Sequence, residues 1–128
     1  MKKILLALDA SEPAGRALET AADLARAFGA ELAVVSVVPA DLAEDEEAML
    51  RSRILRDARH FLADRGVDAE VLEPAGDAAN KIEQITVEGG FDTVVMGGCR
   101  SAGVALTVRG SVAEHVASTV QAIVVLAN

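Results

Sequence analysis

The stretch KKILLALDASEPAGRALETAADLARAFGAELAVVSVV, residues 2–38, decides the fold because its pattern of apolar residues changes twice. It opens with the continuous apolar run 2–9 and closes with a second run, 31–38, which Pro39 stops. Runs of this length and composition are typical of strands that are buried on both faces of a parallel sheet.

Between these two runs the spacing of the apolar residues is helical. Ser11 is placed to act as the N-cap, Pro13 lies in the first turn, and Gly29 follows the last helical residue. The apolar stripe of this helix is formed by Leu18, Ala21, Ala22, Ala25 and Phe28. Residues 2–38 therefore predict a strand–helix–strand unit.

The middle of the chain continues the alternation with a longer helix and a different type of strand. The helix is expected over 43–65, before Gly66, with an apolar side formed by Leu50, Ile54, Ala58, Phe61 and Leu62. The run VDAEVLE, 67–73, alternates apolar and polar residues, which is typical of a half-exposed strand. We expect this strand at an edge of the sheet.

A short helix is expected next. Asp77 is placed to cap it, Ile82 and Ile85 are its apolar residues, and the pair Gly89 and Gly90 ends it.

The last third of the chain adds two strands and a helix. FDTVVMG, 91–97, is a strand of the buried type, and AIVVLA, 122–127, is the final one. Between them Ser111 is placed to cap a helix that turns Val112, Val116 and Val120 inward. Alternating strands and helices predict a three-layer, doubly wound α/β fold of the Rossmann-like kind, with five parallel strands in one domain, 1–128.

Composition narrows the class of protein. Of the 128 residues, 52% are hydrophobic, so the chain can bury a core. No apolar run reaches the roughly 20 residues of a membrane span, and MKKILLALD has too short an apolar core for a signal peptide. The single cysteine, Cys99, cannot form an internal disulfide, which fits a reducing cytoplasm.

The charge and the aromatic content exclude several partners. A formal net charge of −8 argues against a surface for duplex nucleic acid, and three Phe without Trp or Tyr provide no stacking platform for single strands. The acidic run DLAEDEE, 41–47, is interpreted as the solvated first turn of a helix, because no histidine lies near it. His60 and His115 lack the spacing of a metal pair and are expected at the surface.

The predicted fold also indicates where a ligand would bind. In open α/β sheets, ligands lie beyond the carboxyl ends of the strands, where the strand order reverses. In the order 3-2-1-4-5 the first and fourth strands are neighbours, so Asp9 and Ala10 would meet the loop MGGCRSAGVALTVRGS, 96–111. Glycines let a backbone approach a ligand closely, and the helix start at Gly110, Ser111 and Val112 offers free N–H groups to phosphate.

Signatures of other nucleotide sites are missing. The sequence has neither G-x-G-x-x-G after the first strand nor G-x-x-x-x-G-K-[ST], so it supports neither a dinucleotide site nor a P-loop. From composition alone, an ordinary loop remains the alternative to a phosphate-binding one.

The chain resembles the universal stress protein family over essentially its whole length. The resemblance rests on residues 2–38, on AGDAANKI at 75–82, and on DTVVMGG through RGSVAEHV near the end. The nucleotide-binding branch of that family has the pattern G-x-x-G, nine residues, then G-[ST]. Gly97, Gly110 and Ser111 match this pattern, whereas Arg100 replaces its second glycine.

The resemblance implies a site for an adenine nucleotide on an adenine nucleotide alpha hydrolase-like fold. It implies that Asp9 lies beside the adenosine, that the backbone of Val37 meets the adenine edge, and that the glycine loop holds ribose and phosphates. The Arg100 guanidinium could pair with the phosphates, or its side chain could block them. The candidate site residues are Asp9, Ala10, Val37, Met96, Gly97, Gly98, Arg100, Gly110, Ser111 and Val112. The Met96 side chain is expected in the core at a strand end.

The resemblance implies a cytoplasmic stress-response module that binds ATP, with or without Mg²⁺, with slow hydrolysis at most. The alternative is a dimeric interaction protein of the same family that binds no nucleotide. The final strand is uncharged, lacks proline and would lie at the sheet edge. We therefore expect a homodimer joined through Ile123, Val124, Val125 and Leu126, and an unidentified protein partner.

Overall fold

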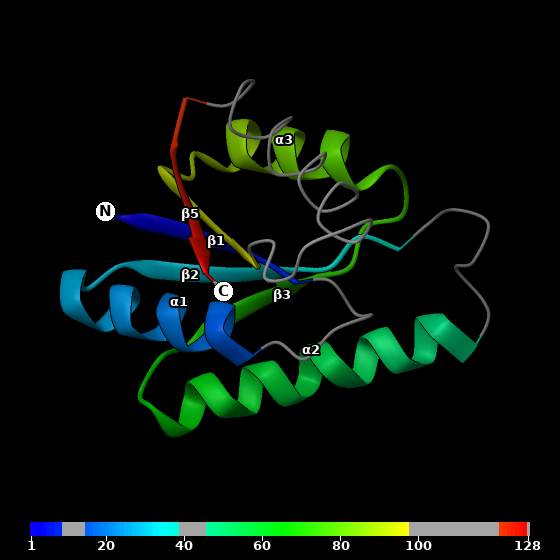
Figure 1. The fold of residues 1–128 in the computed structure, drawn as a ribbon, viewed down its shortest axis with the longest axis horizontal. Helices are drawn as coiled ribbons and strands as arrows, with labels where there is room; N and C mark the ends of the chain where they lie inside the picture. The colour runs from blue at the N-terminus through cyan, green and yellow to red at the C-terminus, as the bar shows by residue number, and fades with distance from the viewer. Residues whose placement is uncertain (9–14, 39–45, 98–120, 128) are drawn as a thin grey trace, which may run out of the picture.

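A computed structural model describes residues 1–8, 15–38, 46–97 and 121–127, and these are the coloured parts of the chain in Figure 1. The strands are β1 (Lys3–Ala7), β2 (Glu31–Val35), β3 (Ala69–Leu72), β4 (Thr93–Gly97) and β5 (Ile123–Ala127). The described helices are α1 (Gly15–Phe28), α2 (Glu46–Asp64) and α3 (Ala78–Gly89).

The five strands form one sheet in the order β3-β2-β1-β4-β5, and every pair of neighbours is parallel. The predicted fold and strand order are confirmed. Ile4 of β1 lies opposite Leu32 of β2 on one side and Thr93 of β4 on the other. β1 is thus the centre of the sheet, and β3 is an edge strand, as its alternating sequence predicts.

Each face of the sheet carries its own hydrophobic core, which explains why β1, β2 and β4 have continuous apolar sequences. Leu6 of β1 packs with α1 and α2, whereas Leu5 packs with α3. Figure 1 shows α1 and α2 together on one side of the sheet and α3 on the other. The side chains of Ile4, Leu5, Leu6, Val34, Val35, Val94 and Val95 are completely buried.

Backbone hydrogen bonds continue past the ends of β2 and β3. Val38 N donates to Pro74 O at 2.8 Å, and Gly76 N donates to Val38 O at 2.8 Å. Val38 and Ala75 form an isolated parallel bridge. The run 31–38 therefore stays paired to its predicted end, although the regular strand stops at Val35.

Both ends of α3 lie where the sequence predicts them. The Asp77 side chain accepts a hydrogen bond from Asn80 N at 3.1 Å, which satisfies a first-turn N–H. Gly90 adopts the left-handed conformation, with φ 70, and its N–H is directed to carbonyls of the last turn. Glycine reaches this conformation without a steric penalty, so the predicted stop is confirmed.

Two core assignments are wrong. Phe28 is 56% exposed, because it is the last residue of α1 and the chain turns away at Gly29, where φ is 62. In α2 the buried side is centred on Leu55, Ala58 and Leu62. It is therefore rotated from the predicted side, and Ile54 is only half-buried.

Several other predictions lie outside the described residues. They include the Ser11 cap, Pro13, residues 41–45 of the acidic run 41–47, and the helix that starts at Ser111. Within the described part of the chain, no helix combines the length and the hydropathy that a membrane span requires.

Candidate functional site

The carboxyl ends of β1 and β4 lie side by side. Ala7 is opposite Met96 in the parallel register, so Leu8 and Gly97 reach the same edge of the sheet. From β1 the chain proceeds to β2 and β3 on one side, and it later returns to β4 and β5 on the other. This is the strand-order reversal at which open α/β sheets bind ligands.

Val37 joins this edge from β2. Leu8 N donates to Val35 O at 2.9 Å, which ties the end of β1 to the end of β2. Val37 is half-buried and packs against the core cluster that contains Ala7 and Met96. Val37, Met96 and Gly97, which are far apart in the sequence, therefore meet at one edge.

The Met96 side chain is only 7% exposed and belongs to the core on the α3 side of the sheet. The expectation of a core residue at a strand end is confirmed.

The remaining candidates, Asp9, Ala10, Gly98, Arg100, Gly110, Ser111 and Val112, lie outside the described residues, so their roles remain predictions. For Asp9, Ala10 and Gly98 the described chain fixes the starting points, since they follow Leu8 and Gly97 closely in the sequence.

Lys81, which the sequence analysis did not single out, also lies near the carboxyl ends of the strands. Gly76, which is paired with Val38, has φ 142, and a Cβ built on it would lie 2.9 Å from Lys81 Cε. The aliphatic part of Lys81 thus covers Gly76, and Lys81 Nζ donates to Gln84 Oε1 at 3.5 Å. A glycine directly before the helix cap at Asp77 was the sequence signal for this close contact.

At the amino-terminal ends of the strands, opposite the candidate site, lies a carboxylate with a shifted pKa, that of Asp92. Burial raises the pKa of Asp92, but hydrogen bonds from Lys2 N, Thr93 Oγ1 and Lys3 N outweigh it and hold the pKa below its ordinary value. The distances are 2.8 Å to Lys2 N and 3.3 Å to Lys3 N, both from Oδ2. Asp92 therefore stabilises the start of β1.

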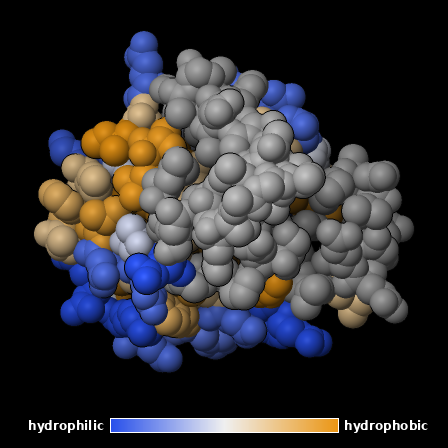
Figure 2. Space-filling view, in the orientation of Figure 1, coloured by the Kyte–Doolittle hydropathy of each residue, from blue (hydrophilic) through white to orange (hydrophobic). Residues whose placement is uncertain are grey.

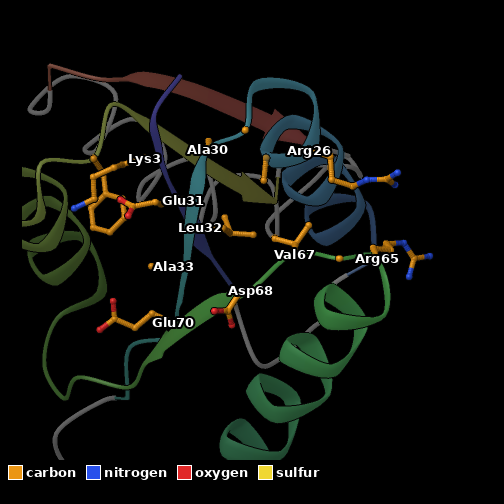
Figure 3. A pocket seen from close by; sticks show the side chains of 14 residues that line it. Lys3, Arg26, Ala30, Glu31, Leu32, Ala33, Arg65, Val67, Asp68 and Glu70 are labelled. Atoms are coloured by element: carbon orange, nitrogen blue, oxygen red, sulfur yellow. The ribbon is translucent and has the colours of Figure 1, made fainter.

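A hollow of about 810 Å³ also opens at this edge (Figure 3). The Arg26 and Arg65 side chains lie on one side of it, and those of Glu31, Asp68 and Glu70 belong to the same lining. The cations and the carboxylates balance, and α1 and α2 present their carbonyl ends here, which disfavours an anion. The hollow is a poor site for a polyphosphate.

Arg65, which directly follows α2, contacts the last turn of that helix. Its guanidinium carbon lies 3.5 Å from the centroid of the Phe61 ring, and Nη1 donates to Phe61 O at 3.5 Å. Among the described residues, no group of three or more His, Cys, Asp or Glu side chains is arranged to hold a metal ion.

Comparison with known proteins identifies the family. The model of the universal stress protein family matches residues 1–127. The universal stress protein YxiE of Bacillus subtilis (strain 168) is 27% identical over an alignment 133 positions long, which covers 89% of this chain and 90% of YxiE.

Solved structures of the family share the fold. The universal stress protein from Archaeoglobus fulgidus in complex with dAMP has a TM-score of 0.80 and 22% identity, covering 100% of this chain and 98% of that one. A universal stress protein in complex with cAMP has a TM-score of 0.82 and 23% identity, covering 99% and 97%. The chain belongs to the universal stress protein family.

Proposed function

We propose that this protein binds an adenine nucleotide, ATP in particular, beyond the carboxyl ends of β1 and β4, and that it acts as a stress-response regulatory module. The observation that carries the proposal is the register of Ala7 with Met96, because it joins both halves of the candidate site at the strand-order reversal. The dAMP and cAMP complexes of structurally similar proteins support the choice of adenine nucleotide.

The proposed contacts are those that the family resemblance implies, and the described ends of β1, β2 and β4 support them. The backbone of Val37 meets the adenine edge, and Asp9 and Ala10 lie beside the adenosine. Met96 contributes its backbone, while Gly97 and Gly98 leave space for the ribose. At the phosphates, the N–H groups of the helix start at Gly110, Ser111 and Val112 donate to oxygens, and the Arg100 guanidinium adds a charged hydrogen bond.

The proposal describes a binding protein that hydrolyses ATP slowly at most. Asp9 is the only acid among the proposed site residues, and we assign it to orient ribose or a Mg²⁺ ion rather than to activate water. The proposal also includes a single domain over 1–128 and a location in the cytoplasm.

The direct experiment is mass spectrometry of nucleotide released from the purified, denatured protein. We expect ATP or ADP at a substantial fraction of one per chain. As a matched control, Arg65→Ala alters the hollow at the opposite edge and should leave the nucleotide content unchanged. If the wild type carries no nucleotide and none can be loaded at millimolar concentration, the non-binding dimeric function is the correct one.

We also propose that two copies pair through β5. β5 bonds to β4 on one side and, within the described residues, has no neighbouring strand on the other. Ile123 is 54% exposed, and an open apolar edge of this type favours pairing with a second chain. Figure 2 shows hydrophobic surface at the left, where the strands begin. A two-fold axis would make the two β5 strands antiparallel.

A further inference from the structure

The outward face of α2 carries two arginines, a methionine and a histidine that face solvent. Met49, Arg53, Arg56 and His60 follow one another at spacings of four, three and four residues, which places them on one side of the helix. All four are exposed, and Met49 is 74% exposed. We call these four residues the α2 stripe.

The orientation of the stripe is fixed by the packing of the opposite side. Leu55, Ala58 and Leu62 are buried against the sheet. Ser52 Oγ donates to Glu73 Oε2 at 2.8 Å, which links α2 to the segment after β3. The stripe therefore points away from the protein on a helix that is held at several positions.

The two arginines of the stripe have no acidic partner in the described part of the chain. Arg53, Arg56 and His60 form no hydrogen bond or ion pair with another described residue. From Met49 through Arg65 the sequence has five arginines and two aspartates, whereas the whole chain has a net charge of −8. The lower part of the molecule in Figure 2, where α2 runs in Figure 1, is largely hydrophilic.

We propose that the α2 stripe binds an acidic segment of a partner protein. Two guanidiniums one turn apart can each form a bidentate pair with a carboxylate, and Met49 offers a flexible apolar contact beside them. From Met49 to His60 the stripe is about 17 Å long, which matches roughly three turns of a helix.

The chemistry favours a short acidic peptide over other anions. The negative charge of the rest of the chain repels a long polyanion such as duplex DNA. The stripe has no aromatic side chain on which a base could stack, and Met49 alone is too small an anchor for a lipid surface. A short acidic helix carries far fewer charges than duplex DNA, so the rest of the chain repels it less, and it needs neither a stacking platform nor a membrane anchor.

The test uses a fluorescein-labelled 16-residue helical peptide with glutamate at every third or fourth position and leucines between, read by anisotropy at low salt. Its control is the same peptide with each glutamate replaced by glutamine. The protein variants are Arg53→Glu with Arg56→Glu, and a matched double reversal of exposed α1 cations, Arg16→Glu with Arg26→Glu. Both double variants change the net charge equally, and all four residues are exposed, so both should fold.

We expect the stripe variant to bind the acidic peptide about tenfold or more weakly, the α1 variant to bind within about twofold of wild type, and salt to weaken binding. Met49→Ala should also weaken it, and amide chemical-shift changes should centre on residues 49–60. Equal losses in both double variants, equal binding of the glutamine peptide, or no binding at millimolar peptide would overturn the proposal. Tighter binding of a 16-base-pair DNA duplex through the same arginines would overturn it in favour of nucleic acid. None of these outcomes depends on whether the protein binds ATP.

Discussion

Asp92 binds the backbone of Lys2: its Oδ2 accepts the Lys2 N–H at 2.8 Å across 90 residues of sequence. The same oxygen accepts from Lys3 N at 3.3 Å, and Oδ1 accepts from Thr93 Oγ1 at 2.9 Å. The start of β1 and the start of β4 are thus joined by one carboxylate. The hydrogen bonds favour its charged form and hold the Asp92 pKa below its ordinary value.

This relationship predicts a pH dependence of stability. The pKa of Asp92 is lower in the folded than in the unfolded protein. Its contribution to the free energy of unfolding is therefore fully present above the pKa of the unfolded state, and it is lost as the pH falls through the pKa of the folded state. Asp92→Ala should cost about 1–2 kcal/mol of unfolding free energy at pH 7, because water partly replaces the lost bonds. Urea denaturation of the wild type and of Asp92→Ala at pH 7 and at pH 3 measures the difference in their unfolding free energies. A difference between wild type and variant that does not shrink at pH 3 would contradict the assignment.

A second prediction concerns Gly89 and Phe91. A Cβ on Gly89 would lie 2.4 Å from Phe91 Cε2 and 2.8 Å from Cδ2, so Gly89→Ala must displace the ring from its packing. We expect a loss of about 1–3 kcal/mol in thermal or urea unfolding.

The control for this prediction is the same change beside a smaller residue. In a Phe91→Ala background, Gly89→Ala should be neutral or stabilising, because alanine favours helix by up to about 1 kcal/mol over glycine. Equal costs in both backgrounds would show that the ring is not the obstacle.

The sequence predicted the fold because each signal was local. The Asp77 cap, the Gly90 stop and the continuous apolar strands depend on nearby residues, and all are found. The errors at Phe28 and Leu55 arose because burial near a helix end and the rotation of a helix are set by where the sheet lies. Val37 and Met96 meet only through the register of three strands, and their meeting therefore followed from the predicted strand order rather than from any local pattern. The contact between Gly76 and Lys81 was missed because it depends on the path of one flexible side chain.

The dimer prediction can be tested at Val124. Ile123 N donates to Asp92 O, toward β4, and alternate residues of a parallel strand turn their N–H groups to opposite sides. The Val124 N–H therefore faces the open edge, where a second copy would accept it. Val124→Pro should yield monomers, whereas Val124→Ala keeps the donor and should remain dimeric. Analytical ultracentrifugation of the wild type and both variants at tens of micromolar measures the oligomeric state of each. A monomeric wild type would rule the dimer out.

Arg100 provides a test of how the altered glycine motif works. If its guanidinium pairs with phosphate, Arg100→Ala should weaken ATP more than AMP, by about 1.5–3 kcal/mol for a charged hydrogen bond. If the side chain obstructs the site, Arg100→Gly should tighten ATP instead. Titration calorimetry with both nucleotides separates the two cases, and unchanged affinities in both variants would contradict each of them.

Calorimetric titration of ATP into the wild type and into Gly110→Val tests the central claim most directly. The valine adds a bulky side chain at the proposed phosphate contact, while the described sheet and helices stay unchanged. We predict that the wild type binds ATP in the presence of Mg²⁺ and that Gly110→Val does not, with both proteins unfolding at similar temperatures. No heat of binding from ATP or ADP to the wild type at millimolar concentration, or equal binding by both proteins, would contradict the proposed site.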